Sequence, residues 1–139
     1  QILRSWYMIA FQLPAVAETA LRLAGPVRAA RSLERDGLDA PTAERYAARM
    51  ASPSEMTTRI DWYRALPLGP RRPLPAVGVP TLYLWGTRDH YLTRYSAEAC
   101  GRFVEAPYRF EVLQGASHWL PTTAADRVGP LLLEHLAGA

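Results

Sequence analysis

Lysine is absent from this chain of 139 residues, so all 16 basic residues are arginines. They are interleaved with 13 acidic residues, the formal net charge is only +3, and the one dense basic point is Arg71-Arg72. A dispersed set of charges is typical of a solvated surface, whereas nucleic-acid binding requires a concentrated basic patch. We therefore expect no nucleic-acid partner. The lack of lysine beside abundant Ala, Arg, Pro and Leu also indicates a GC-rich, bacterial genome.

Cysteine, histidine and long apolar runs are scarce as well. The single cysteine, Cys100, permits no internal disulfide, which favours a reducing cytoplasm, and we expect its side chain to pack as a small apolar residue. Three separated histidines provide no metal-ligand spacing and no glycine-rich phosphate loop occurs, so neither a metal nor a cofactor is expected. No apolar run approaches the roughly 18 residues of a membrane-spanning helix. Residues 1–30 also lack the pattern of a signal peptide.

The first half of the chain has the apolar periodicity of helices. A hydrophobic content of 49% and a charged content of 21% are typical of a globular protein. We predict helices over residues 2–13, 14–23, 27–35, 41–50 and 52–66, with a break at Gly25-Pro26 and with Thr42 as the N-terminal cap of the fourth helix. Residues 1–66 are therefore expected to form a helical domain.

A proline-rich stretch separates this half from the rest. Four prolines occur within the nine residues 67–75, which argues against regular structure there. We expect residues 67–78 to be an extended linker.

Beyond the linker, strand-like and helical patterns alternate. Strand-like runs occur at 81–85 and 109–113, and helical patterns follow at about 94–104 and 124–136. Strands separated by helices pair in parallel, so residues 79–139 are expected to form the last βαβα portion of a doubly wound parallel sheet in an α/β fold. Two parallel strands are a poor sheet alone, and we expect this part to require further strands for stability.

Two residues with catalytic potential follow the predicted strands. Asp89 comes after the strand that ends at Gly86, and His118 comes after the strand that ends at Gly115. Ligand sites of such sheets lie beyond the carboxyl ends of the strands. A carboxylate behind a histidine fixes its tautomer and stabilises the imidazolium, as a general base requires. Each residue alone has a structural alternative, a closed turn or a loop hydrogen bond, but their joint context favours a catalytic pair.

Four segments resemble a known family. The stretches V-P-T-L-Y-L-W-G-T-R-D at 79–89 and Q-G-A-S-H-W-L-P at 114–121 resemble the C-terminal part of α/β-hydrolases. The stretches R-S-W-Y-M-I-A-F-Q-L-P at 4–14 and T-T-R-I-D-W-Y-R-A-L at 57–66 resemble cap-domain motifs of the soluble-type epoxide hydrolases. The resemblance extends over residues 4–136. It implies an α/β-hydrolase fragment, with 1–66 as the cap domain and 79–139 as the C-terminal part of the core.

The same resemblance implies roles for individual residues. Asp89 would be the triad acid and His118 the base, while Tyr7 and Tyr63 would hydrogen-bond the epoxide oxygen and assist ring opening. No G-x-S-x-G motif and no aspartate counterpart of it occurs, so the nucleophile is expected upstream of Gln1. The implied substrate is a small apolar epoxide or ester-like molecule. From the residues alone, a tyrosine beside a tryptophan on a helix is also typical of core packing.

Two further side chains are candidates for substrate binding. Gln12 is polar within an apolar helix and could line the pocket, with helix capping or a solvent-facing position as alternatives. Trp119 is expected to pack against His118 and shield its imidazole, although a core role explains it equally well. No feature of the sequence indicates an oligomeric state.

Other functions stay open on the sequence. An esterase or a haloalkane dehalogenase would share the fold and the Asp–His pair, and would differ at the missing nucleophile or its surroundings. If the natural polypeptide begins at Gln1, a catalytically inert hydrolase-like binding module becomes the better interpretation, because a base without a nucleophile cannot complete the reaction.

Overall fold

The computed structural model describes residues 6–50, 52–69, 73 and 75–138. The chain forms two compact units, Ile2–Arg72 and Pro73–Ala139, which we term the helical unit and the sheet unit. The boundary between them lies within the predicted linker. Part of that linker is regular, because a short 3-10 helix, η1 (Leu66–Leu68), includes Pro67. The prediction of an extended stretch from residue 67 onward is therefore wrong at its start.

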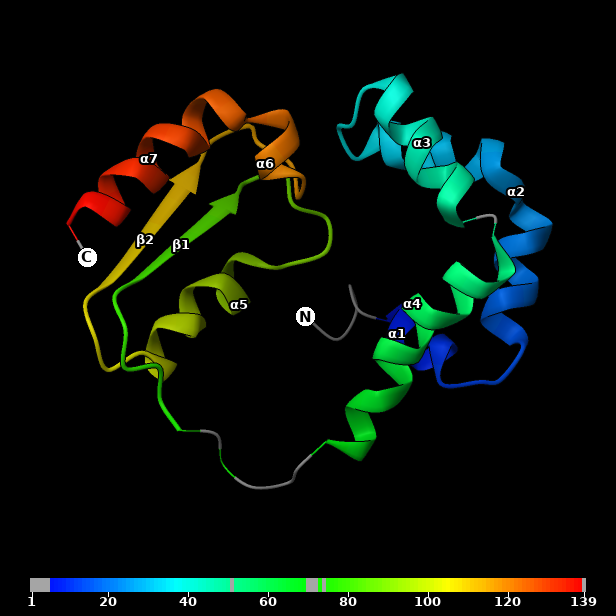
Figure 1. Ribbon diagram of the computed structural model, residues 1–139, viewed down its shortest axis with the longest axis horizontal. Coiled ribbons are helices and arrows are strands. Elements are labelled where there is room, and N and C mark those ends of the chain that lie inside the picture. Colours follow the sequence, from blue (N-terminus) through cyan, green and yellow to red (C-terminus); the bar gives the residue numbers. More distant parts are fainter. Residues whose placement is uncertain (1–5, 51, 70–72, 74, 139) are drawn as a thin grey trace. The chain divides into compact units, whose positions relative to one another are not determined.

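The helical unit consists of α1 (Trp6–Phe11), α2 (Val16–Arg35), α3 (Ala40–Met50) and α4 (Pro53–Ala65) (Figure 1). The predicted helices 14–23 and 27–35 are merged into α2, yet the predicted break is present as a kink at Gly25, with φ 72° and ψ 165°. Residues 2–5 of the first predicted helix lie outside the described residues.

The N-terminal cap of α3 differs from the prediction. The carboxylate of Asp39, one residue before the helix, accepts a hydrogen bond of 2.8 Å from the backbone N–H of Thr42. Asp39 is therefore the capping residue and Thr42 is capped. Thr42 was the wrong choice because it lies in the first turn of α3, where its backbone N–H has no partner within the helix and itself needs a cap.

The core of the helical unit lies between α2 and α4. Ala17, Met56 and Ile60 are almost fully buried, and Phe11 and Leu21 pack against them. The kinked α2 packs along α3, where Ala30, Ala43 and Ala47 are buried. Small side chains at these positions let the two helix backbones approach closely.

The sheet unit contains two strands, β1 (Thr81–Gly86) and β2 (Tyr108–Leu113), which pair in parallel from Thr81↔Tyr108 to Gly86↔Leu113. The predicted strands and their parallel pairing are confirmed. The crossover between the strands is α5 (Arg94–Ala99) followed by a 3-10 helix, η2 (Cys100–Phe103), where a single helix was predicted. The half-buried Cys100 donates its thiol hydrogen to the carbonyl of Ser96 at 3.3 Å.

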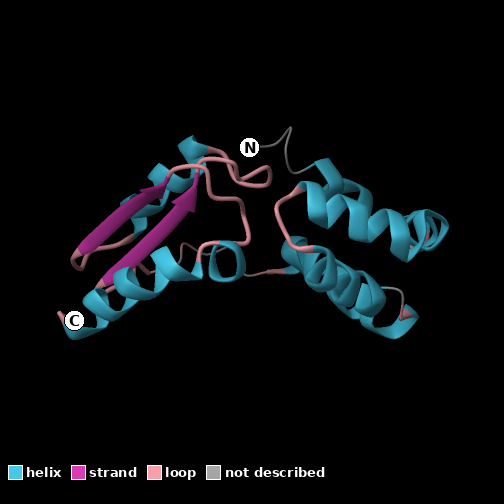
Figure 2. Cartoon of the chain, turned by 90° about the horizontal axis from the view of Figure 1, so that it is seen from above, coloured by secondary structure: helices cyan, strands magenta, loops and turns pink. Residues whose placement is uncertain are grey.

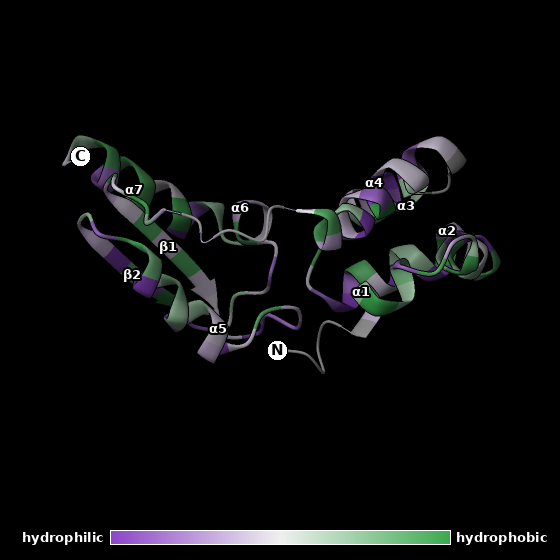
Figure 3. Cartoon of the chain, turned by 90° about the horizontal axis from the view of Figure 1, so that it is seen from below, coloured by the Kyte–Doolittle hydropathy of each residue, from purple (hydrophilic) through white to green (hydrophobic). Residues whose placement is uncertain are grey.

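After β2 the chain forms α6 (Leu120–Thr123), which was not predicted, and α7 (Ala125–Ala137). A core cluster of Leu113, Ala116, Leu120 and Ala124 packs against Leu84 of β1 and against Val128 and Leu131 of α7. Alternate residues of a strand point to opposite faces of a sheet. Leu113 of β2 belongs to the cluster that packs against α7, whereas Tyr108 of the same strand lies against Gly101 of η2. The crossover and α7 therefore cover opposite faces of the two-stranded sheet (Figure 2). Hydrophobic residues of α7, which appear green in Figure 3, supply one of these layers.

Candidate active site

The loops that follow the two strands are joined backbone to backbone. The N–H of Thr87 donates to the carbonyl of Leu113 at 3.2 Å, and the N–H of Arg88 donates to the carbonyl of Ala116 at 2.9 Å. The hydroxyl of Thr87 in turn accepts a hydrogen bond of 2.8 Å from the N–H of Gly115. These bonds hold the Asp89 loop and the His118 loop together at the carboxyl edge of the sheet.

The structure brings Asp89 and His118 into direct contact. Oδ2 of Asp89 lies 2.9 Å from Nδ1 of His118. The other carboxylate oxygen, Oδ1, accepts hydrogen bonds from the backbone N–H groups of Tyr91 at 2.7 Å and Leu92 at 2.8 Å. Because hydrogen bonds engage both oxygens of this carboxylate, its orientation toward the imidazole is fixed.

Burial of the pair is strongly asymmetric. The side chain of Asp89 is only 5% exposed, whereas that of His118 is 37% exposed. When Nδ1–H donates to the carboxylate, Nε2 carries the lone pair, which leaves it able to accept a proton from a water molecule. A buried acid behind an accessible imidazole is the arrangement that a histidine general base requires.

Two aromatic rings flank the imidazole of His118. The ring of Tyr91 lies 4.8 Å away between centroids at 55°, and the ring of Trp119 lies 5.6 Å away at 84°. The predicted packing of Trp119 against His118 is thus present, while a role in substrate binding stays a prediction. The Tyr91 segment is itself held by the indole N–H of Trp85, which donates to the carbonyl of Leu92 at 3.3 Å.

The two other histidines occupy different positions. His90 is exposed beside Asp89, and His135 is half-buried in α7. Among the described residues, no group of three or more His, Cys, Asp or Glu side chains is arranged to hold a metal ion. No helix in the described part of the chain is long and apolar enough to cross a bilayer.

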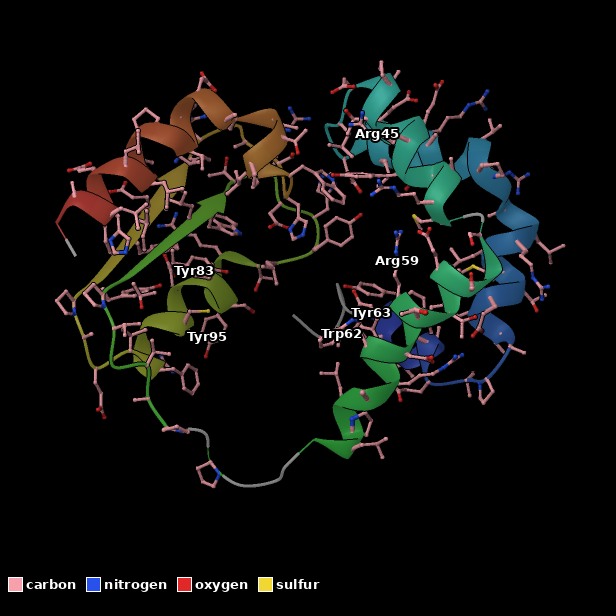
Figure 4. The ribbon with its side chains drawn as sticks, in the orientation of Figure 1. Arg45, Arg59, Trp62, Tyr63, Tyr83 and Tyr95 are labelled. Atoms are coloured by element: carbon pink, nitrogen blue, oxygen red, sulfur yellow. The ribbon has the colours of Figure 1, made fainter. Side chains whose placement is uncertain are left out.

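In the helical unit, the two candidate tyrosines lie next to each other. Tyr7 of α1 and Tyr63 of α4 have ring centroids 5.8 Å apart and nearly perpendicular planes at 78°. Phe11 completes the cluster, 5.5 Å from Tyr7 and 5.0 Å from Tyr63. Both tyrosines are half-buried, and Figure 4 shows Tyr63 beside α1. The predicted pair is therefore assembled, although its catalytic role stays a prediction.

Gln12 is engaged by the protein itself. Its side-chain amide donates to the carbonyl of Tyr63 at 2.7 Å and to that of Met8 at 3.4 Å. The residue is exposed, and it ties the end of α1 to α4. Its contact with substrate stays a prediction, because these hydrogen bonds explain its position without a substrate.

Sequence reasoning missed the ion pair beside the tyrosines. Arg64 of α4 binds Glu18 of α2 with two hydrogen bonds, at 2.7 Å and 3.0 Å. Hydrogen bonding to Arg64 lowers the pKa of Glu18, and the same contact raises the pKa of Arg64. The two residues are separated by 46 positions, so no local pattern could have indicated the pair.

The chain is similar in sequence to known hydrolases. The chain is 32% identical over 131 residues to epoxide hydrolase 3 of Mus musculus, covering 87% of the chain and 35% of the mouse protein. It is 30% identical to the AB hydrolase superfamily protein YfhM of Bacillus subtilis, covering 98% of the chain and 49% of that protein. Epoxide hydrolase 3 of Xenopus tropicalis is 29% identical, with 98% of the chain and 40% of the relative covered. No protein-family profile matches the chain.

These similarities, together with the parallel β1–β2 pair, define the structure as part of an α/β-hydrolase fold. The chain is similar to members of the epoxide hydrolase-like family of that superfamily. It spans between about a third and a half of the length of the curated relatives it matches. The family resemblance predicted from the motifs is confirmed.

Proposed function

We propose that the complete protein hydrolyses epoxides to vicinal diols through an ester intermediate. The observation that carries the proposal is the 2.9 Å contact between Oδ2 of Asp89 and Nδ1 of His118, because it prepares Nε2 to accept a proton from water. The names of two of the relatives above, both epoxide hydrolases, support the substrate class.

In the first step, an aspartate carboxylate from the upstream part of the protein attacks one epoxide carbon. The carbon–oxygen bond of the ring breaks, and the oxygen leaves as a developing alkoxide. The phenols of Tyr7 and Tyr63 hydrogen-bond this oxygen, and one of them transfers its proton to it. The product of this step is a hydroxyalkyl ester of the aspartate.

In the second step, His118 removes a proton from water and the resulting hydroxide attacks the ester carbonyl. The acyl–oxygen bond breaks, the diol leaves and the aspartate is regenerated. Asp89 stabilises the imidazolium that forms on His118. The proton on His118 returns to the tyrosine through solvent, so that the sum of both steps is epoxide plus water giving diol.

The clustering of Tyr7 and Tyr63 favours this reaction over ester or haloalkane hydrolysis. When an epoxide ring opens, the negative charge develops on an oxygen that remains part of the substrate, and two neighbouring phenols can both donate hydrogen bonds to that oxygen. The test is to incubate the complete protein with styrene oxide, p-nitrophenyl acetate and 1-bromobutane. We expect a diol from the epoxide at a rate far above those with the other two. Turnover of the ester or the bromoalkane without diol formation would contradict the proposal.

A further inference from the structure

Arg64 connects three segments around the tyrosine cluster. Its guanidinium binds both carboxylate oxygens of Glu18 at 2.7 Å and 3.0 Å, which links α4 to α2. Its Nε donates to the carbonyl of Phe11 at 3.0 Å, and a terminal nitrogen lies 3.4 Å from the carbonyl of Leu13. The last carbonyls of a helix have no partner within the helix, so Arg64 satisfies the end of α1 from outside.

This ion pair differs from the pairs within α4, which are Arg59–Glu55 and a contact of 3.2 Å from Arg64 to the 56% exposed Asp61. Arg64 and Glu18 are 23% and 13% exposed, whereas the pair Arg59–Glu55 lies within one helix and is 48% and 51% exposed. Bidentate binding of a carboxylate by a guanidinium fixes both distance and orientation, while an exposed pair of flexible side chains contributes little. The Arg64–Glu18 contact therefore fixes the position of α4 relative to α2.

A second connection completes the arrangement around Tyr63. The amide of Gln12 donates to the Tyr63 carbonyl at 2.7 Å, so here the segment after α1 supplies the donor and α4 the acceptor. In the bond from Arg64 to Phe11, α4 supplies the donor and α1 the acceptor. The end of α1 and the end of α4 are therefore linked reciprocally, immediately beside the ring of Tyr63. α1 has only six residues, and so short a helix does not hold its orientation without tertiary contacts.

We propose that Arg64 and Glu18, with Gln12, form a latch that positions Tyr7 of α1 against Tyr63 of α4 for donation to the epoxide oxygen. The three side chains are positioning residues, and none of them needs to touch the substrate. This inference rests on the proposed function, and it assigns to the ion pair control of ring opening in particular. His118 acts in the second step, so the latch does not affect ester hydrolysis.

The test is Glu18→Gln in the complete protein, with Glu55→Gln as a matched control on α4. A misplacement of catalytic groups by about 1 Å costs on the order of 10²-fold in rate. We therefore expect ester formation to slow by roughly 10- to 100-fold in single-turnover experiments, with ester hydrolysis unchanged and with kcat affected more than KM. We expect Glu55→Gln to match the parent in both steps.

A double-mutant cycle with Tyr63→Phe adds a readout that general damage to the fold would not move. If the latch acts through the tyrosine pair, Tyr63→Phe slows ester formation much less in the Glu18→Gln background than in the parent. Equal slowing of both chemical steps, or additive effects of the two substitutions, would overturn the proposal.

A second measurement does not depend on turnover. In selectively tyrosine-labelled protein, rings with centroids 5.8 Å apart are expected to give nuclear Overhauser effects between Tyr7 and Tyr63. These signals should disappear in Glu18→Gln and persist in Glu55→Gln, and their persistence in Glu18→Gln would refute the latch. A parent protein without epoxide turnover would contradict the proposed function instead, and the ring signals would still decide whether the latch exists.

Discussion

A Cβ atom built on Gly86 would lie 2.6 Å from the carbonyl oxygen of Ser117, and it would also collide with the carbonyl of Ala116. The end of β1 and the segment that precedes His118 therefore pack backbone against backbone. The position of the imidazole depends on this contact, because Ser117 directly precedes His118. Glycine is required at position 86 for reasons of space.

Substitution Gly86→Ala should therefore displace the His118 loop. Overpacking of this kind costs about 1–3 kcal/mol, and the shift of the base should lower epoxide turnover on the order of 10²-fold. Gly129→Ala in α7 is the matched control, because no atom lies within 4 Å of the added methyl group and alanine favours helices. Thermal unfolding and diol formation measure both effects. Parent-like turnover in Gly86→Ala would show that the loop adjusts without moving the base.

Asp89→Asn should abolish the function of the pair while preserving its shape. The two backbone N–H donors at Oδ1 can still be accommodated by the amide oxygen, but the amide NH₂ then faces Nδ1 of His118 and favours the wrong tautomer. We expect ester hydrolysis to slow by roughly 10³- to 10⁴-fold, with a burst of ester formation that precedes a slow steady state. Steady-state rates within tenfold of the parent would contradict the assigned role of Asp89.

Acid should destabilise the helical unit through two carboxylates. Hydrogen bonding to Arg64 lowers the pKa of Glu18 below its ordinary value of 4.5, and hydrogen bonding to the Thr42 backbone lowers the pKa of Asp39 below 3.8. A lowered folded-state pKa contributes stability that is present above the ordinary value and is lost as the pH falls through the folded value. Urea unfolding monitored by circular dichroism from pH 7 to pH 3 should therefore show falling midpoints below about pH 4.5. The decline should be shallower in Glu18→Gln, and an identical decline in the variant would count against the pair.

The two sides of α4 should respond differently to truncation. Ile60 is 3% exposed within the core cluster, whereas Trp62 is 78% exposed. Ile60→Ala should lower the free energy of unfolding of the helical unit by about 2–5 kcal/mol. Trp62→Ala should change it by less than about 0.5 kcal/mol, as surface substitutions usually do. Denaturant titration of both variants checks this, and equal losses would mean that α4 is oriented differently.

The meeting of Asp89 and His118 was predictable because it follows from topology. Each residue comes directly after a strand, the strands are separated by a helix, and the carboxyl ends of parallel strands share one edge. The pairing from Thr81↔Tyr108 to Gly86↔Leu113 places those ends side by side. The local patterns thus sufficed for the sheet and for its candidate site.

Contacts between distant segments could not be predicted in this way. Arg64 and Glu18 are 46 residues apart, and Gln12 is 51 residues from Tyr63, so only the packed helices reveal that they meet. The kink at Gly25 was predicted as a gap, since glycine and proline signal an interruption but do not show whether the helix resumes along a similar axis.

The most direct test of the account is the mass of a His118→Gln variant of the complete protein after incubation with styrene oxide. The epoxide should still react with the nucleophile but the ester should not be hydrolysed, so the protein should gain the mass of one epoxide and retain it. Tyr7→Phe with Tyr63→Phe in the same background should suppress that gain. Continued diol formation by the His118→Gln variant at the parent rate, with no mass increase, would contradict the assignment of the Asp89–His118 pair as the base that hydrolyses the ester.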